Sequence, residues 1–364
     1  MSLLHQIALT KIKGIGPVLA RSLLSHFGNA KAVFSASNKE LLGIPGIGNQ
    51  LAGVITATPA LREAEKELEF AEKHGISVLF QDHAEYPKRL KSCYDAPLLL
   101  YYKGNADLNH RRVVSVVGTR SATDYGKSIC AALMEGLAPY QVIVVSGLAY
   151  GIDSYAHRDA LKRGIPTVGV LGHGLDRVYP AANRNLAKQM LECGGLLTEF
   201  SSGTNPDKSN FPMRNRIIAG LADVTIVVEA ASRGGALITA ELANNYNRDV
   251  CAFPGNTRQE FSAGCNYLIK TNRANLMTHA KDLEYLMNWT AGPAKTTPAQ
   301  LALPLSLTAD QQTVYGIVKQ MNEAGIDELS YRLNWPQSKL AITLLELEIN
   351  GAIVALPGKV FRPA

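Results

Sequence analysis

Short, nearly continuous apolar runs alternate with helical stretches through the middle of the chain, and this alternation limits the possible folds more than any other feature. The runs cover residues 113–117, 142–145, 167–171, 196–198, 224–228 and 250–253. Stretches with helical character lie between them, at residues 125–137, 152–163, 183–193 and 237–246. Runs of this kind are typical of parallel strands that are buried on both faces. The order therefore predicts an α/β fold with a doubly wound parallel sheet.

Glycine, serine and polar residues directly follow most of these runs. Val117 is followed by Gly118-Thr119-Arg120, Val145 by Ser146-Gly147, and Phe253 by Pro254-Gly255-Asn256. In open parallel sheets, ligands bind outside the carboxyl ends of the strands. Glycine at one strand end could do no more than make a tight turn, but several such loops in one sheet favour a shared ligand cleft.

The segment 211–241 combines an aromatic side chain, basic side chains and a glycine turn. Phe211 leads into Arg214-Asn215-Arg216, and Gly234-Gly235 precedes a helical stretch. Backbone N–H groups at a helix N-terminus stabilise an anion, and arginines form charge-assisted bonds to phosphate oxygens. The segment therefore indicates a ligand that carries both phosphates and bases. Two structural alternatives stay open, because Phe211 could belong to the core and Arg216 could pair with Glu229 or Asp223.

The first sixty residues contain an internal repeat. Residues 12–20 (IKGIGPVLA) and 44–52 (IPGIGNQLA) share two glycines that allow a tight hairpin with positive φ before the next helix. The repeat resembles a tandem, SAM-like helix-hairpin-helix module that grips nucleic-acid backbone without reading sequence, although it could also only turn the chain between packed helices. Residues 1–60 hold five basic residues against one acidic residue. Auxiliary contacts to DNA backbone are expected at Gly14, Gly16, Gly46 and Gly48.

The C-terminal region has the order of a winged helix. Residues 288–306 are rich in Pro, Ala and Thr and read as a linker. Residues 307–364 predict three helices followed by a small hairpin across Pro357-Gly358-Lys359. Five basic and six acidic residues give this unit a slight negative charge, which argues against strong duplex binding and favours contact with a protein.

Length and composition limit the number of domains and the kinds of partner that this chain can have. The chain has 364 residues and a net charge of +6, which suits two or three domains and allows an acidic partner. We expect an all-helical unit at 1–60, a Rossmann-like domain at 61–287, the linker and the winged-helix-like domain at 307–364. The five cysteines lack metal-ligand spacing, so we expect no metal site and a cytoplasmic location. No signal-peptide pattern and no run of about 18 apolar residues occurs, which disfavours secretion and membrane insertion.

The middle of the chain resembles the DprA/Smf family, the DNA-processing protein A family of bacterial transformation. The resemblance covers residues 80–285 closely, and the flanking units are similar to additions seen in many members. Seven motifs occur in order, and they are VGTR at 117–120 with Tyr125-Gly126, SGLAYGIDSYAH at 146–157, GHGLDRVYPAAN at 172–183, FPMRNRIIAG at 211–220, VVEA at 227–230, GGALITA at 234–240 and PGN at 254–256.

The resemblance implies an extended Rossmann-like protein that binds single-stranded DNA without sequence specificity. It also implies a homodimer formed through that domain, protection of incoming DNA, and help in loading RecA recombinase during natural transformation. It implies neither catalysis nor a cofactor. The family more often has Ser-Gly where this chain has Gly234-Gly235, so a side-chain contact to phosphate is not expected there. The expected DNA-binding residues are Gly118, Thr119, Arg120, Gly147, Lys208, Phe211, Arg214, Asn215, Arg216, Gly234, Gly235 and Asn256.

Two other functions stay open. Gly234-Gly235 with Thr239 and Glu241 loosely resembles the PGGxGTxxE loop of cytokinin-type nucleoside-monophosphate phosphoribohydrolases, although Leu237-Ile238 interrupts the pattern. The second alternative is an interaction hub whose C-terminal unit recruits a partner protein. Asp153 and His157 lie four residues apart on one predicted helix, where packing is favoured over a catalytic pair. The chain contains no P-loop pattern, which disfavours ATP hydrolysis.

Overall fold

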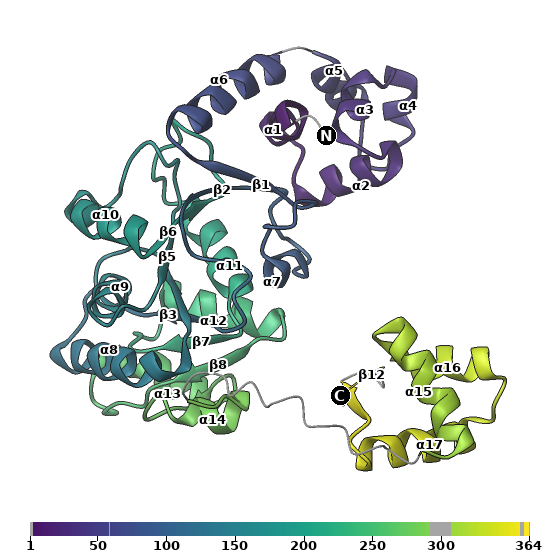
Figure 1. Ribbon diagram of the computed structural model, residues 1–364. Helices are drawn as coiled ribbons and strands as arrows, with labels where there is room; N and C mark the ends of the chain where they lie inside the picture. The colour runs from purple at the N-terminus through teal and green to yellow at the C-terminus, as the bar shows by residue number, and fades with distance from the viewer. Residues whose placement is uncertain (1–2, 58, 292–306, 357–359, 364) are drawn as a thin grey trace. The chain divides into compact units, whose positions relative to one another are not determined.

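The computed structural model describes residues 3–57, 59–291, 307–356 and 360–363. These residues form two compact units, one before and one after the interval 292–306 (Figure 1). The first unit contains the N-terminal helices and a nine-stranded sheet with helices on both faces. The predicted fold class is confirmed.

Six helices build the N-terminal part of the first unit. They are α1 (Leu3–Lys11), α2 (Pro17–Phe27), α3 (Ala30–Ser35), α4 (Asn38–Leu42), α5 (Asn49–Thr56) and α6 (Pro59–Lys73). The two sequence repeats form hairpins before α2 and before α5, in which Gly14 and Gly46 adopt φ values of +90° and +89°. The α-carbon of Gly14 faces Leu51 and that of Gly46 faces Leu19, so each hairpin packs on the equivalent leucine of the other. The predicted helix-hairpin-helix pair is therefore one symmetric unit.

The sheet has the order β1-β2-β6-β5-β4-β3-β7-β8-β9. Strands β3 to β9 run parallel to one another, as predicted, whereas β2 pairs antiparallel with both β1 and β6. The strand bounds are β1 (Ser77–Phe80), β2 (Leu99–Gly104), β3 (Val113–Val117), β4 (Ile143–Ser146), β5 (Thr167–Val170), β6 (Gly194–Thr198), β7 (Val224–Val227), β8 (Asp249–Ala252) and β9 (Asn275–Leu276). Residues 113–117 and 224–227 are buried throughout, which explains their continuous apolar character.

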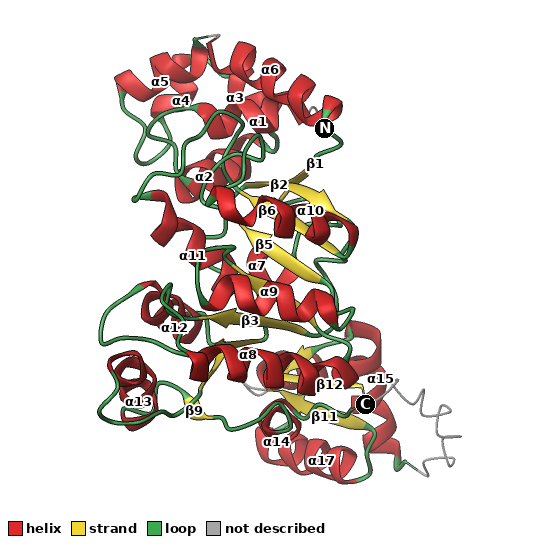
Figure 2. Cartoon of the chain, turned by 90° about the vertical axis from the view of Figure 1, so that its left-hand side faces the viewer, coloured by secondary structure: helices red, strands yellow, loops and turns green. Residues whose placement is uncertain are grey.

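Helices cover both faces of this sheet (Figure 2). One face packs against α7 (Lys88–Lys91), α11 (Asn210–Leu221), α12 (Gly235–Asn245) and α13 (Ala263–Lys270). The other packs against α8 (Asp124–Leu137), α9 (Ile152–Lys162), α10 (Arg184–Glu192) and α14 (Asp282–Met287). Short 3-10 helices span Ala138–Tyr140, Ala181–Asn183 and Glu260–Ser262. The FPMRNR segment, residues 211–216, lies inside α11.

The N-terminal helices share a hydrophobic core with the first edge of the sheet. Ile7 and Leu23 belong to the same buried cluster as Phe80 of β1 and Tyr101 of β2. The buried Ala64 of α6 joins this cluster as well. The expected boundary at residue 60 therefore crosses a continuous core, and the domain limits stay a prediction.

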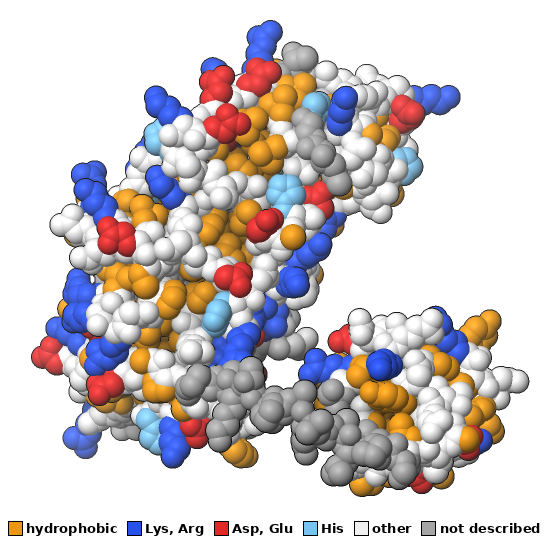
Figure 3. Space-filling model, viewed as in Figure 1, with side chains coloured by type: hydrophobic (Ala, Val, Ile, Leu, Met, Phe, Trp, Pro, Cys, Tyr) orange, Lys and Arg blue, Asp and Glu red, His pale blue; other side chains and the backbone are white. Residues whose placement is uncertain are grey.

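The second unit has winged-helix order. It contains α15 (Ala309–Met321), β10 (Ala324–Gly325), α16 (Ile326–Leu333), α17 (Gln337–Ile349), β11 (Ile353–Leu356) and β12 (Val360–Pro363). The predicted hairpin is formed by β11 and β12, which pair antiparallel, and β10 adds a third strand to β12. Figure 3 shows hydrophobic side chains exposed on the visible face of this unit. Most of the predicted linker and the turn at 357–359 lie outside the described residues.

The described helices are short for a bilayer. The longest, α6, has 15 residues, many of them charged. Across the part of the chain that the structure describes, no helix has the length and apolar character needed to cross a membrane.

Two glycine substitutions near the second hairpin should change stability in opposite directions. Gly46→Ala forces a positive φ on an L side chain, which should cost about 1–2 kcal/mol. Gly53 lies within α5, and an added Cβ there would meet nothing within 4 Å. Gly53→Ala should therefore stabilise the chain by about 0.5–1 kcal/mol through helix propensity. Urea unfolding followed by circular dichroism measures both changes, and equal losses would contradict this description of the hairpin.

Candidate functional site

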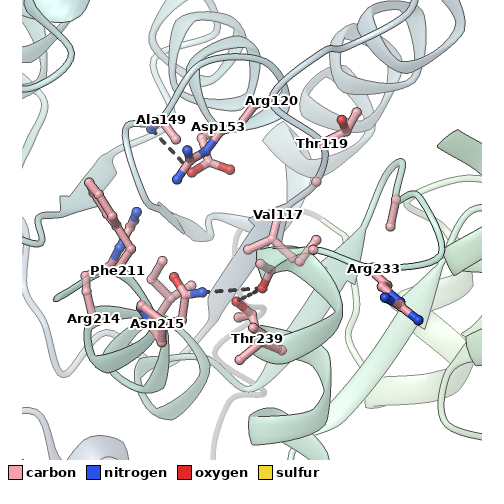
Figure 4. A pocket seen from close by; sticks show the side chains of 18 of the residues that line it. Val117, Thr119, Arg120, Ala149, Asp153, Phe211, Arg214, Asn215, Arg233 and Thr239 are labelled. Atoms are coloured by element: carbon pink, nitrogen blue, oxygen red, sulfur yellow. Dashed lines mark hydrogen bonds between the residues drawn. The ribbon is translucent and has the colours of Figure 1, made fainter. Parts of the chain in front are cut away.

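A cleft of about 680 Å³ opens at the carboxyl ends of β3 and β7 (Figure 4). The chain leaves β3 toward β4 on one side and returns, after β6, to β7 on the other. Open α/β sheets bind ligands at such a reversal of strand order, because the loops that follow the two strands diverge. Three segments form most of the cleft lining: residues 117–120 after β3, residues 206–218 leading into α11, and residues 230–239 leading into α12. Ala149, Asp153 and Tyr179 complete it.

Most of the predicted binding residues meet in this cleft, although they are far apart in the sequence. Nine of the twelve line it, namely Gly118, Thr119, Arg120, Lys208, Phe211, Arg214, Asn215, Gly234 and Gly235. Their role in binding stays a prediction, and the structure brings them to one place.

An aromatic corner forms one wall of the cleft. Phe211 is half-buried, and the Arg120 guanidinium lies over its ring, with Cζ 5.4 Å from the ring centroid. The exposed ring of Tyr179 lies beside it at a centroid separation of 6.1 Å. Gly172 supports the ring from below, since a Cβ there would lie 3.2 Å from Phe211 Cδ1. The Phe211 ring therefore faces the cleft on one side and packs against Gly172 on the other.

Arg214 lies beneath the cleft and is only 4 % exposed. Its Nη1 donates to the Val170 carbonyl at 3.0 Å, and its Nε has no hydrogen-bond partner among the described residues. Burial lowers the pKa of Arg214 to about 10, although the neighbouring Asp153 carboxyl opposes this shift. The guanidinium therefore stays charged at neutral pH. Gly147 leaves room for it, because a Cβ at that position would lie 1.6 Å from Nη1.

The N-terminus of α12 lies at the cleft. Gly234, Gly235 and Ala236 line the cleft at the start of this helix, which has no side-chain cap. At the start of α12, Asn215 Nδ2 and Thr239 Oγ1 donate to the Gly235 carbonyl at 3.3 and 2.9 Å (Figure 4). Uncapped N-termini leave backbone N–H groups and a partial positive charge for an anion.

The cleft carries an excess of positive charge. Its cations are Arg120, Lys208, Arg214 and Arg233, and its carboxyl group is Asp153. Burial raises the pKa of Asp153, and the Arg214 cation opposes this shift. Arg233 lies across the cleft from Phe211 (Figure 4). The arrangement suits an anion that also presents a flat ring.

Three predicted residues lie outside the cleft lining. Arg216 points from α11 to Glu199 and to the Asp95 carbonyl, and it is 8 % exposed. Its role fits the ion-pair alternative, with Glu199 as the partner. Gly147 lies against the Arg214 guanidinium and affects the cleft only by leaving room for that side chain. Asn256 follows β8, where its Oδ1 accepts from the Arg258 N–H at 2.9 Å.

Asp223 and Glu229, the partners that the sequence offers for Arg216, have other contacts. Asp223 pairs with Arg89 at 2.5 Å. Glu229 is buried and accepts from the Thr123 N–H at 3.0 Å and from Thr123 Oγ1 at 2.5 Å, which fixes the start of α8. Both carboxylates therefore hold the sheet and its helices together.

The phosphoribohydrolase alternative gains no support from this geometry. Glu241 lies in a separate groove between α12 and α13 and pairs with Arg273 at 3.5 Å. Thr239 uses its hydroxyl within α12. The two residues that suggested the enzyme loop therefore do not meet in one site.

The four auxiliary glycines lie in the N-terminal hairpins, apart from the cleft. Gly16 and Gly48 are the N-cap residues of α2 and α5, and both have extended backbone and no side-chain cap. In both hairpins, the first N–H groups of the following helix therefore lack a side-chain acceptor.

Tyr179 is a cleft residue that sequence reasoning missed. It lies in the motif GHGLDRVYPAAN, residues 172–183, which follows β5. An aromatic residue beside a proline in a loop after a strand was the available signal. Within the described ranges, no three His, Cys, Asp or Glu side chains gather as a metal site.

Family models match three parts of the chain. The model described as DNA recombination-mediator protein A matches residues 77–288. A SAM-like helix-hairpin-helix tandem matches residues 7–58, and a DprA winged helix domain matches residues 295–359. The chain is 37 % identical to Protein Smf of Synechocystis over 73 % of this chain and 68 % of that protein. It is 44 % identical to the DNA processing protein DprA of Streptococcus pneumoniae over 54 % of this chain and 70 % of that protein.

Solved structures of DNA processing protein A have a similar fold. DNA processing protein A from Streptococcus pneumoniae gives a TM-score of 0.64 at 33 % identity, over 79 % of this chain and 98 % of that one. DNA processing protein A from Helicobacter pylori gives 0.54 at 28 % identity, over 59 % and 97 %. The latter structure is described in terms of a single-stranded DNA binding mode.

His157, behind the cleft, should make stability depend on pH. The side chain is fully buried, and its Nδ1 lies 2.6 Å from Thr167 Oγ1, whose proton goes to the Val144 carbonyl. Burial, helped by the Arg214 cation, lowers the pKa of His157 to about 3. Below its ordinary pKa of 6.5 the unfolded chain binds a proton that the folded chain does not. Stability should therefore fall by about 1.4 kcal/mol per pH unit between about pH 6 and 4.

Urea unfolding of the native chain and of His157→Gln across this range measures the contribution. The loss of unfolding free energy with falling pH should be smaller in the variant, because glutamine does not titrate. Parallel pH profiles for the two proteins would show that His157 is not held neutral.

Proposed function

The chain belongs to the DNA recombination-mediator protein A family, and from this premise we propose that it binds single-stranded DNA in the cleft and acts as a recombination mediator. The observation that carries the proposal is the pairing of the half-buried Phe211 ring with the Arg120 guanidinium, above the buried and incompletely bonded Arg214. The described binding mode of the Helicobacter pylori relative supports the same ligand.

Each cleft residue has a role that its contacts allow. Phe211 stacks on a base, while Arg120 and Lys208 contact phosphates that flank it. The start of α12 receives another phosphate, where Asn215 and Thr239 hold the Gly235 carbonyl. Arg214 adds positive charge from below. This set contacts the features that all nucleotides share, so binding is expected to tolerate any sequence.

We propose binding without catalysis. Asp153 is the one carboxyl group that lines the described cleft, and burial raises its pKa. It accepts a hydrogen bond from the Ala149 N–H at 3.4 Å, which gives it a structural role at the start of α9. Release of ribose 5-phosphate from AMP would contradict a purely binding role.

The transfer of the bound strand to a recombinase is proposed because the chain belongs to a family of recombination mediators. The bound strand would be protected in the cleft and passed to RecA recombinase in the cytoplasm, during natural transformation. The N-terminal hairpins would add sequence-independent contacts to DNA backbone through the helix starts at Gly16 and Gly48. RecA-dependent strand exchange on DNA coated with single-strand binding protein measures the transfer.

We also propose a homodimer formed through the Rossmann-like domain. The groove between α12 and α13 supports this proposal, because it is lined by Tyr267 and Leu268, and Tyr267 is exposed. The exposed Leu276 lies on the neighbouring edge strand β9. Sedimentation velocity of the chain and of Tyr267→Glu tests this face.

Two substitutions separate charge from stacking in the cleft. Fluorescence anisotropy of a labelled oligo-dT of about 30 nucleotides, across a salt series, measures the contributions of charge and of stacking to the binding free energy. Arg120→Ala should weaken binding and reduce the salt slope by about 0.7, because one phosphate contact is lost. Phe211→Ala should weaken binding by about 1–3 kcal/mol, roughly 5- to 150-fold, with the salt slope unchanged.

Arg163→Ala is the matched control, because it removes one charge just before β5, near the amino ends of the parallel strands and opposite the carboxyl ends that form the cleft. It should leave oligo-dT binding unchanged. The matched duplex should bind more weakly than the single strand. Normal affinity in both Arg120→Ala and Phe211→Ala would rule out this cleft as the binding site.

The C-terminal unit is proposed to contact a protein. Gln337 and Lys339 of α17 are engaged within the unit, with Asp327 at 3.3 Å and Asp310 at 2.8 Å. The exposed residues of α17 include Ile342, Leu345 and Ile349 instead. Deleting residues 290–364 should leave oligo-dT affinity within about twofold and lower RecA-dependent strand exchange. A large loss of oligo-dT affinity would instead show that this unit binds DNA.

A further inference from the structure

The loop between β6 and α11, residues 199–209, carries Lys208 to the edge of the cleft. It contains Pro206 and Lys208, which line the cleft, and it leads directly to Phe211. Lys208 is exposed. A long and exposed side chain gains affinity for a ligand only to the extent that its backbone is held in place beforehand. The contacts that hold this loop therefore bear on binding.

A buried glutamate from the N-terminal part of the chain holds the loop at Ser202. Glu67 lies on α6 and is 4 % exposed. Its Oε1 accepts from the Ser202 N–H at 2.8 Å, and its Oε2 accepts from Ser202 Oγ at 2.7 Å. Lys11 Nζ lies 3.6 Å from the same Oε2. Both oxygens of one buried carboxylate thus serve a single loop residue.

The opposite side of the loop is held by the segment after β5. Asp176 Oδ1 accepts from the Gly203 N–H at 3.1 Å, and Arg177 Nη1 donates to Asn205 Oδ1 at 2.5 Å. Both of these pairs are exposed, so each contributes little to rigidity on its own. The charge-assisted bonds that Ser202 donates to the buried Glu67 carboxylate are the stronger class. Without the bonds to Glu67, these side-chain contacts would hold the loop only on the side of Asp176 and Arg177.

We propose that Glu67 is a positioning residue for single-stranded DNA binding: it acts through Ser202 to hold Lys208 at the cleft. This inference rests on the proposed function of the cleft. It makes the N-terminal helices necessary for full affinity even where they do not touch DNA. Lys11 extends the connection, because it ends α1 immediately before the first hairpin.

A double-mutant cycle tests the inference with the whole chain and labelled oligo-dT. Lys208→Ala should weaken binding about fivefold in the native chain and less than about twofold in Glu67→Ala, because the lysine is already misplaced there. Glu67→Ala alone should weaken binding by about three- to fivefold, and by no more than Lys208→Ala does, because it acts through the lysine. Arg120→Ala, which lies on a different loop, should weaken binding by the same factor in both backgrounds.

Two control variants match the charge and the shape of Glu67. Glu65→Ala removes the same charge from the exposed side of α6 and should bind normally. Glu67→Gln should retain binding within about threefold, because its amide oxygen can accept from the Ser202 N–H and its amide nitrogen can donate to Ser202 Oγ. Tryptic cleavage after Lys208 should quicken in Glu67→Ala and stay at the native rate in both controls.

Thermal melting checks that each variant folds. If Glu67→Ala does not fold, Ser202→Ala replaces it in the cycle, since it removes the Oγ bond from a half-buried loop position. Losses that multiply independently for Lys208 and Glu67 would overturn the inference while leaving the proposed function standing. Failure of the native chain to prefer oligo-dT over duplex would overturn both.

Discussion

Close approach of the backbone at three glycines makes the cleft possible. An added Cβ would lie 2.5 Å from Ile152 at Gly118, 2.2 Å from the Thr119 carbonyl at Gly151, and 1.6 Å from the Arg214 guanidinium at Gly147. A side chain at any of these positions would separate the loops that follow β3 and β4, or displace the buried arginine. The position of the start of α9 and that of the buried arginine charge thus depend on the absence of a side chain at these three residues.

Local patterns explain why the strands and their terminal loops could be predicted. A parallel strand buried on both faces needs a continuous apolar run, and the tight turn after it needs glycine, so both are written in consecutive residues. Arg214 and Arg216 could not be separated in this way. Successive residues of α11 turn by about 100°, so Arg214 faces the cleft with Phe211 while Arg216 points to Glu199. Glu199 follows a different strand, and no local pattern identifies it.

The connection between the N-terminal helices and the sheet shows the same limit over a longer distance. Composition and the glycine repeat suggested a separate unit that ends near residue 60. The structure continues the core through α6 to β1 and β2, and places Glu67 against Ser202. A domain boundary depends on how many contacts cross it, and contacts between distant residues leave no periodic trace in the sequence. The cleft could therefore be predicted better than the parts that support it.

The two ends of the sheet constrain how the chain meets other molecules. The sheet ends in β1, with four residues, and in β9, with two. An edge strand carries unpaired backbone N–H and C=O groups, and a long flat edge recruits strands from other chains into aggregates. Edges this short offer few such groups. The sheet is therefore poorly suited to growth from molecule to molecule, and copies that associate would do so through the side chains of helices.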